Sequence, residues 1–296
     1  MKEKNEKKSD QSRVVVIGAH GFVGKHLMQA LAQASIPALG LGRAEVDLTD
    51  PQAVARLTKL LQPEDSVVFL SAITPDKGKS RLDFQKNIHM GMAVCDALDK
   101  VGPSQLIYFS SDAVYRMENQ PVDETTPCAP QDLYGTMHRA RELLCGSLNL
   151  PLWILRPTLI YGIGDTHGSY GPNRFLKQAL TSREIILFGE GEEKRSHVSV
   201  HDVVAVLIQG LQQAKTGVLN VATEPSLSFQ EVASLIQENL PFSVTIKRAP
   251  RGSGPITHRH YVLDQLYDRF PTLSLVPPQK GIASLVKQSL RENAHA

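Results

Sequence analysis

The stretch RVVVIGAHGFVG, residues 13–24, decides the fold of this 296-residue chain. Its first half, RVVVIG, is a β-branched run that ends in glycine, a pattern typical of a buried parallel strand. Its second half places glycines at positions 18, 21 and 24, and the segment 22–34 that follows has the apolar spacing of a helix. A strand, a glycine-rich turn and a helix in this order predict the first βαβ unit of a doubly wound sheet. In such a unit the turn holds a phosphate group at the N-terminus of the helix.

The N-terminal half continues this alternation of strands and helices. We expect strands at IPALGLG (36–42), SVVFLSA (66–72), QLIYFSS (105–111) and PLWILRP (151–157), and helices at 51–61, 82–101 and 132–148. After about residue 165 glycine and proline become frequent, and GVLNVA (217–222) is the one late strand expected to return to the sheet. We therefore predict an α/β fold with a doubly wound parallel sheet of the Rossmann type. The dinucleotide-binding domain spans 13–165 with the strand near 217–222, and a smaller, interleaved C-terminal α/β part, 166–296, mainly binds the substrate.

Composition excludes several classes of protein. A net charge of +2 gives no electrostatic reason to expect a nucleic-acid or membrane partner, and no apolar run reaches the length of a bilayer span. The charged N-terminus, residues 1–12, lacks the apolar segment of a secretory signal and is expected to be a flexible tail. The three cysteines and the histidines show no metal-ligand spacing, so we expect reduced thiols, a cytoplasmic location and no metal site.

The glycine turn reads GxxGxxG, and this spacing resembles the extended short-chain dehydrogenase/reductases, the NAD-dependent group of nucleotide-sugar epimerases, dehydratases and reductases. The resemblance implies a bound NAD(P). On the family pattern, the residues that hold the cofactor near the glycine turn and after the third strand are Gly18, Gly21, Phe22, Val23, Gly24, Ser71 and Ala72.

The segment after the second strand, LGLGRAEVDLTD, bears on the choice between NAD and NADP. It lacks the acidic residue that holds the ribose of NAD, and Arg43 stands where a 2′-phosphate would be met. Asp47, followed by Leu48, matches the family aspartate that contacts adenine. We therefore expect NADP ahead of NAD, with a plain surface arginine as the alternative interpretation of Arg43.

The catalytic residues implied by the resemblance are Ser111, Tyr134 and His138. Ser111 lies four residues before an aromatic in YFSSDAVY, where the family has the Ser or Thr that polarises the substrate oxygen. Tyr134 matches the family tyrosine, which exchanges a proton with the sugar oxygen while hydride moves to or from the nicotinamide. A free phenol has a pKa near 10, which is too high for a base at neutral pH.

The family corrects this with a lysine four residues after the tyrosine, but here that position is His138. The lysine lowers the phenol pKa and holds the nicotinamide ribose, whereas a histidine is mostly neutral at pH 7 and keeps only the hydrogen bond. Arg139 and Arg141 follow, and we expect both to point to other faces of the helix.

Other positions bear on the reaction and the substrate. Ala113 occupies the place of the glutamate that 4,6-dehydratases of the family use, so we do not expect that reaction. The substrate-binding residues implied by the resemblance are Ser111, Asp112, Asn173, Arg195, Arg251 and Arg259, with Arg195 as one clamp for a diphosphate and either Arg251 or Arg259 as the second. An exposed charge beside two glutamates is the alternative interpretation of Arg195.

These features together predict an NAD(P)-dependent keto-sugar reductase or 4-epimerase acting on a nucleotide-activated sugar. The alternative is a catalytically silent NAD(P)-binding scaffold or sensor, which the missing lysine favours. Family members often pair through a four-helix interface, so the resemblance also implies a homodimer.

Overall fold

The computed structural model describes residues 13–118, 120–165, 168 and 171–295. The predicted flexible tail, residues 1–12, lies outside the described residues. Among those that are described, no helix is both long and apolar enough to cross a lipid bilayer.

Six parallel strands form the central sheet, in the order β11-β6-β4-β3-β1-β2. Their bounds are β1 (Val14–Ile17), β2 (Ala38–Leu41), β3 (Ser66–Phe69), β4 (Gln105–Phe109), β6 (Leu152–Pro157) and β11 (Gly217–Val221). The strand order reverses between β1 and β3, which confirms the predicted doubly wound sheet. In such sheets a crevice opens at the carboxyl ends of the two strands where the order reverses, and ligands bind there.

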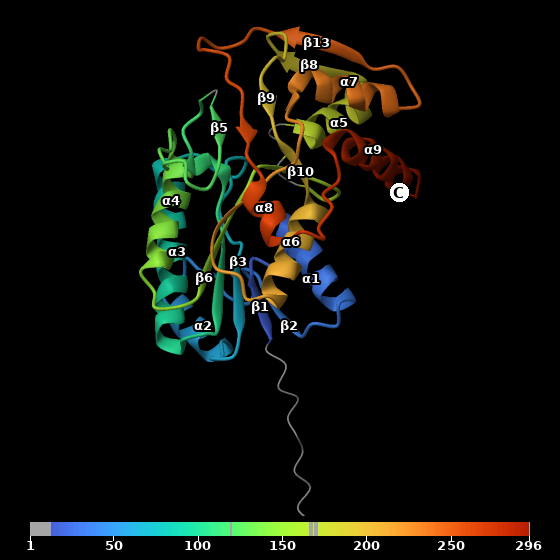
Figure 1. Ribbon diagram of the computed structural model, residues 1–296. Coiled ribbons are helices and arrows are strands. Elements are labelled where there is room, and N and C mark those ends of the chain that lie inside the picture. Colours follow the sequence, from blue (N-terminus) through green and yellow to red (C-terminus); the bar gives the residue numbers. More distant parts are fainter. Residues whose placement is uncertain (1–12, 119, 166–167, 169–170, 296) are drawn as a thin grey trace, which may run out of the picture.

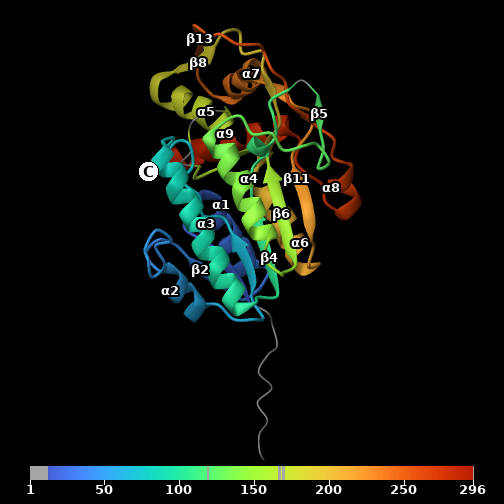
Figure 2. The same cartoon turned by 90° about the vertical axis from the view of Figure 1, so that its left-hand side faces the viewer.

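Helices cover both faces of the sheet (Figures 1 and 2). On one face lie α1 (Phe22–Gln33) and α6 (Val200–Gln212), and on the other lie α2 (Ala53–Leu60), α3 (Arg81–Val101) and α4 (Leu133–Gly146). The central strand β1 explains this arrangement, because successive side chains of a strand point to opposite faces. Val14 and Val16 pack in the core cluster of α1 and α6, and Val15 and Ile17 pack in the cluster of α2 and α3. All four are buried, so the run VVVI is the hydrophobic centre of both layers.

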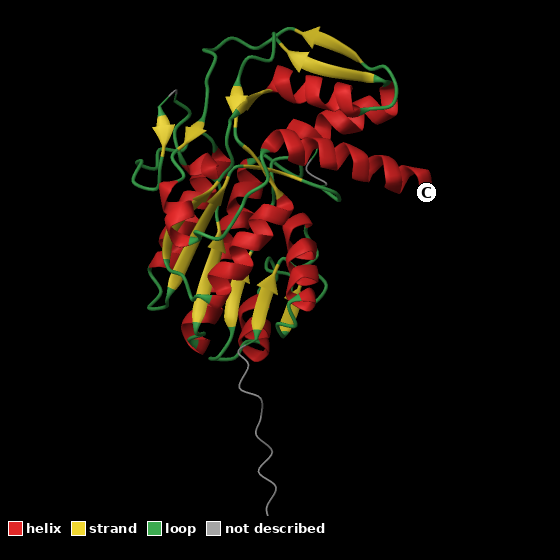
Figure 3. Ribbon diagram, turned by 45° about the vertical axis from the view of Figure 1, so that its right-hand side comes forward, coloured by secondary structure: helices red, strands yellow, loops and turns green. Residues whose placement is uncertain are grey.

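A second part of the chain sits above the carboxyl ends of the strands (Figure 3). It contains α5 (Gly171–Ser182), α7 (Phe229–Asn239) and α9 (Pro278–His295), whereas α8 (Asp264–Arg269) packs beside β11 of the central sheet. Four pairs of short strands accompany them: β7 (Leu159–Tyr161) with β10 (His197–Ser199), β8 (Glu184–Phe188) with β13 (Thr245–Ala249), β9 (Lys194–Arg195) with β12 (Leu227–Ser228), and β5 (Pro121–Val122) with β14 (His260–Tyr261). Phe175, Leu187, Val232 and Ile236 form a separate core between the helices α5 and α7 and strand β8. This part therefore closes over the crevice of the sheet.

Candidate active site

The glycine turn after β1 brings two backbone segments into contact. Gly18 has a φ of +102°, and a Cβ there would lie 2.9 Å from both the backbone nitrogen and the Oγ of Ser71. A Cβ on Gly24 would lie 2.2 Å from the carbonyl oxygen of Gly18. No side chain fits at these two positions, so the turn presents bare backbone beside the N-terminus of α1, where the helix dipole favours an anion.

A cavity of about 200 Å³ opens over this turn, and we call it the glycine-loop cavity. Of the residues predicted from the sequence, its walls include Gly18, Gly21, Phe22, Val23, Gly24, Ala72, Ser111, Asp112, Tyr134 and His138. The fold thus brings ten predicted site residues, from segments far apart in the sequence, around one space.

The remaining predicted cofactor residues line a neighbouring cavity of about 200 Å³, the Arg43 cavity, whose walls also include Asp47, Leu48 and Ser71. The Arg43 guanidinium is 85% exposed and donates to the Asp47 carboxylate over 2.9 Å. Hydrogen bonds from the side chain and backbone of Thr49, with Arg43 adding to them, lower the pKa of Asp47 to about 2. Asp47 is therefore ionised at neutral pH and holds Arg43 at the cavity wall.

The first turn of α4 places Tyr134 beside Ser111. The Asp132 carboxylate caps the helix by accepting a hydrogen bond from the Gly135 amide at 2.7 Å. A Cβ on Gly135 would lie 2.1 Å from the carbonyl oxygen of Ala113, so only glycine lets the helix press against the 3-10 turn η1 (Asp112–Val114). The Ser111 hydroxyl, at the start of that turn, accepts from the Ala113 amide at 3.1 Å.

Tyr134 is half-buried, and its phenol is protonated at neutral pH. Burial raises the pKa of Tyr134 above its ordinary value, and the nearby carboxylates Asp112, Asp132 and Asp76 act in the same direction. Arg141 opposes them, because a positive charge favours the phenolate.

His138 is buried one helical turn from Tyr134, with the two rings edge to face and 4.6 Å between their centroids. Burial, with Arg141 adding to it, lowers the pKa of His138 to about 3, so the imidazole is neutral at physiological pH. Its Nδ1 lies 2.8 Å from the Tyr108 hydroxyl. Its Nε2 is buried, has no hydrogen-bond partner among the described residues, and belongs to a ring that lines the glycine-loop cavity.

The expectation that Arg141 points away from the site is wrong. Its side chain is buried, and its guanidinium lies 5.0 Å over the ring of Phe69 at the end of β3. It donates to the carbonyl of Ser71 at 2.7 Å and to that of Asn87. Position 141 is seven residues after Tyr134, which is two helical turns, so both lie on one face of α4. Arg139 does point elsewhere: its side chain is 38% exposed and pairs with Glu142.

A larger cavity of about 760 Å³, the central cavity, adjoins the glycine-loop cavity. Ser111, Asp112, Tyr134 and Leu159 line both, so the two hydroxyls predicted to be catalytic stand where the two spaces meet. Arg195 and Arg259 also line the central cavity.

The two arginines of the central cavity are more enclosed than surface residues. The Arg195 side chain is 14% exposed and donates to the carbonyl and hydroxyl of Thr257, so it is not the exposed charge of the alternative interpretation. Burial lowers the pKa of Arg195, which means that an anion in the cavity would stabilise its charge. Arg259 is 1% exposed, and its Nε has no partner within the described part of the chain.

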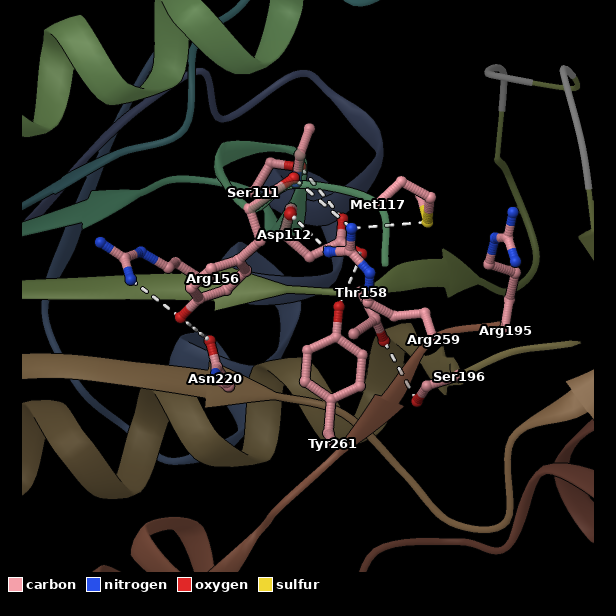
Figure 4. A network of polar contacts seen from close by, with 12 residues as sticks. Ser111, Asp112, Met117, Arg156, Thr158, Arg195, Ser196, Asn220, Arg259 and Tyr261 are labelled. Atoms are coloured by element: carbon pink, nitrogen blue, oxygen red, sulfur yellow. Dashed lines mark hydrogen bonds and ion pairs between the residues drawn. The ribbon is translucent and has the colours of Figure 1, made fainter. Parts of the chain in front are cut away.

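Asp112 joins the two halves of the molecule (Figure 4). The Tyr261 hydroxyl donates to its carboxylate at 2.8 Å, and Arg259 donates to its backbone carbonyl at 3.1 Å. Arg259 also donates to the carbonyl of Arg116 at 2.8 Å. Strand β14 therefore holds the loop that carries Ser111.

Two predicted substrate residues lie elsewhere. Asn173 does not line the cavities described above, because its amide is engaged with the backbone of Gly162, to which it donates at 2.7 Å and from which it accepts at 3.1 Å. Arg251 pairs with Glu193 at 3.1 Å and lines a third space of about 220 Å³. We call this space the phenylalanine cavity because its walls include Phe175, Phe188 and Phe229.

The site fits a dinucleotide cofactor on structural grounds. The turn at Gly18 and Gly24 leaves no room for side chains and presents backbone amides at a helix start. The ring of His138 lines the same cavity, and its buried Nε2 requires a hydrogen-bond partner. The model for the family described as "NAD dependent epimerase/dehydratase family" matches residues 14–222. The chain belongs to this family. The resemblance to extended short-chain dehydrogenase/reductases is thereby confirmed, and the fold matches theirs.

Some known proteins are similar to most of this chain, and others are similar to about half of it. The chain is 29% identical over 245 residues to an N-acetyl-alpha-D-glucosaminyl-diphospho-ditrans,octacis-undecaprenol 4-epimerase of Escherichia coli O157:H7, which covers 77% of this chain and 72% of the relative. It is 30% identical over 158 residues to methionine adenosyltransferase 2 subunit beta of Rattus norvegicus, which covers 51% of this chain and 47% of that protein. The solved structure of MoeE5 in complex with UDP-glucuronic acid and NAD has a TM-score of 0.83 at 21% identity, with 95% of this chain and 100% of that chain covered. At that identity the likeness shows the fold.

Several residues of the site were not predicted from the sequence. Lys77 and Thr158 line the glycine-loop cavity, and the Asn87 amide holds the loop after β3 through the backbone of Ile73. Tyr108 escaped notice because one tyrosine in an apolar strand gives no signal of its own. Arg141 did give a signal, the spacing of positions 134, 138 and 141 along one helix face.

Proposed function

We propose that this protein is an NAD(P)-dependent reductase or 4-epimerase of a nucleotide-activated sugar. The observation that carries the proposal is the junction of the two cavities at Ser111 and Tyr134. A cofactor on the glycine turn and a sugar in the central cavity would meet at these two hydroxyls.

When bound, the nicotinamide would exchange a hydride with a sugar carbon. Tyr134, which is protonated at neutral pH, would donate its proton to the sugar oxygen in reduction and take it back in oxidation. Ser111 would hydrogen-bond the same oxygen and hold it in place. His138 would donate to the nicotinamide ribose from its buried Nε2. Ala113 carries no base, so the proposal leaves out 4,6-dehydration.

The substrate side supports a sugar linked to a diphosphate. Arg195 and Arg259 line the central cavity, and guanidinium groups bind phosphate oxygens through paired hydrogen bonds. Beyond them, the phenylalanine cavity offers aromatic walls and Arg251 to a planar base. The central cavity shares Glu193 and Phe229 with it, so sugar, diphosphate and base would lie along one path.

The test is turnover of UDP-glucose, UDP-N-acetylglucosamine and UDP-glucuronic acid with NAD and NADP, followed by NMR of the sugar and by absorbance of the reduced nicotinamide. Tyr134→Phe should lower turnover roughly a hundred- to ten-thousand-fold and leave cofactor affinity nearly unchanged. Tyr267→Phe, at a 44% exposed position, is the matched control and should behave as wild type. Undiminished turnover in Tyr134→Phe would rule out the assignment of Tyr134.

A second candidate is a silent NAD(P)-binding scaffold. His138 in place of the lysine favours it, and so does the similarity to a protein whose name is that of a subunit of another enzyme. The discriminating result is a wild-type protein that binds cofactor, measured by thermal shift, yet turns over none of the sugars with either cofactor.

Both candidates are compatible with a homodimer formed by α3 and α4, which lie side by side on one face (Figure 2). Met92 on α3 and Leu143 on α4 are 48% and 59% exposed, unusual values for large apolar side chains on neighbouring helices. We expect the wild type to sediment as a dimer and a Met92→Lys/Leu143→Lys variant to sediment as a monomer.

A further inference from the structure

The neutral His138 leaves one task of the family lysine unassigned. A lysine at this position would bring both a hydrogen-bond donor and a positive charge to the site. His138 is buried and neutral, so it brings no charge. The surroundings of His138 and Arg141 account for both tasks.

The contact with Tyr108 decides which nitrogen of His138 carries the proton. Tyr108 is buried, and its hydroxyl lies within hydrogen-bond distance of the His138 Nδ1. If the Tyr108 hydroxyl donates to Nδ1, its proton is satisfied and the imidazole proton sits on Nε2. If Nδ1 donated instead, the Tyr108 proton would be buried without an acceptor among the residues that the structure describes, which is costly. The unpartnered Nε2, on a ring that lines the glycine-loop cavity, is therefore a donor, as a lysine ammonium would be.

The charge comes from Arg141, on the same face of α4. Its hydrogen bonds go to neutral oxygens, the carbonyls of Ser71 and Asn87. None of the ion pairs found among the described residues includes Arg141, so no carboxylate cancels its charge. Space for its side chain exists because position 91 on α3 is glycine, where a Cβ would lie 3.0 Å from the Arg141 Cγ.

We propose that two residues share the work of one lysine in this chain: His138, oriented by Tyr108, donates the hydrogen bond to the cofactor, and Arg141 supplies the positive charge near Tyr134. The inference rests on the proposed function, since it assigns roles within the same site. Arg141 and Tyr108 are positioning residues, because they act through His138 and Tyr134.

The first experiment tests whether His138, oriented by Tyr108, donates the hydrogen bond to the cofactor. Affinities for NADH and NADPH are determined by fluorescence titration for the wild type, Tyr108→Phe and the control Arg139→Met. Loss of the Tyr108 hydroxyl lets the imidazole take either tautomer, so we expect three- to tenfold weaker binding, which corresponds to about 0.6–1.4 kcal/mol. Arg139→Met removes a charge from the same helix outside the cavity and should bind as wild type does. Affinity for both cofactors within twofold of wild type in Tyr108→Phe would overturn the assignment of the donor.

The second experiment tests the role of the Arg141 charge by moving the positive charge from position 141 to position 138. His138→Lys alone adds a buried cation near Arg141 and should lower the melting temperature and the cofactor affinity. Adding Arg141→Met restores a single cation, and we expect the double variant to melt higher and bind NADH more tightly than His138→Lys alone. A merely structural Arg141 predicts the opposite, because the two losses would add. Arg141→Lys, which keeps the charge, should bind NADH more tightly than Arg141→Met.

The outcomes separate this inference from the proposed function. A wild type that binds NADH but turns over no sugar refutes the function and leaves the divided roles standing. A wild type that binds neither NADH nor NADPH refutes both. A double variant whose melting temperature and NADH affinity fall by the sum of the losses in the two single variants refutes the role of Arg141 and leaves the role of His138 standing.

Discussion

Replacing Glu142 by glutamine should strongly destabilise the protein. The Glu142 carboxylate has no exposed surface and accepts hydrogen bonds from Ser110 at 2.7 Å, from Arg156 at 2.8 Å through both Nε and Nη2, and from Arg139 at 3.0 Å. Arg156 is itself 4% exposed. Burial acts to lower the pKa of Arg156, and the Glu142 carboxylate more than offsets this, so the pKa is raised. An amide at position 142 would turn two of its own donors toward a guanidinium whose charge is no longer balanced.

Removal of one partner of a buried ion pair costs about 3–5 kcal/mol. At about 2–4 °C per kcal/mol for a domain of comparable size, the melting temperature should fall by roughly 6–20 °C. Calorimetry and urea unfolding measure the change. The control Arg139→Met removes an exposed partner of the same carboxylate and should cost less than about 1 kcal/mol.

A Glu142→Gln/Arg156→Met variant gives the second control. It removes both charges, so it should recover part of the stability that Glu142→Gln loses. A Glu142→Gln protein within about 1 kcal/mol of wild type would refute the argument, because it would mean that the Arg156 charge needs no buried partner.

Three further predictions concern the cofactor and the pH. Gly24→Ala should weaken binding of both NADH and NADPH more than about tenfold because its methyl group would clash with backbone 2.2 Å away, whereas Gly146→Ala, with open space around it, should bind normally. Arg43→Ala should weaken NADPH roughly three- to tenfold in titration and spare NADH; equal effects on both would exclude a contact with the 2′-phosphate. Burial lowers the pKa values of His138 and His197 to about 3 and about 4, below their value in the unfolded chain. Their contribution to the free energy of unfolding is therefore complete above about pH 6.5 and is lost as the pH falls, because the unfolded chain then binds protons that the folded chain does not. In urea unfolding, the free energy of unfolding should fall by about 1.4 kcal/mol per histidine between about pH 7.5 and 5.5. The variant His197→Gln should lack the part of this pH dependence that comes from His197.

The doubly wound sheet was predictable because its central strand carries an unmistakable pattern. The run VVVI of β1 is buried on both faces, and a strand of that kind occurs almost only in the middle of a parallel sheet. The glycine turn that follows fixes where the chain must approach a phosphate group. Pattern and structure agree here because the local chain and its tertiary surroundings require the same residues.

The C-terminal helices were not predictable in the same way. Helix α6 begins in the sequence SVHDVVAVLIQG, where the valines favour a strand. The chain is helical there because Ser199 caps the helix by accepting from the Asp202 amide, and because Val203, Val206 and Leu207 pack in the core cluster that includes α1. Packing against a distant element outweighs local preference in such a segment.

Arg141 illustrates a different limit of sequence analysis. Its spacing from Tyr134 places it on the catalytic face of α4, but an arginine at such a position is ordinarily expected at the surface. Whether it is buried depends on Gly91, which lies on another helix, and on the carbonyls of Ser71 and Asn87 that accept its hydrogen bonds. None of these partners is near it in the sequence, so only the folded chain brings them together.

The C-terminal part does more than cover the candidate site, because it also holds the loop that carries Ser111. The Ser111 hydroxyl is oriented by the turn that Asp112 begins, and Asp112 is held by Tyr261 and Arg259 from a strand about 150 residues later. Arg259 also lines the central cavity, so an anion bound there would act on the same side chain that holds the Ser111 turn. On the proposed function, substrate contact and the placement of the serine hydroxyl would therefore be joined through one buried guanidinium.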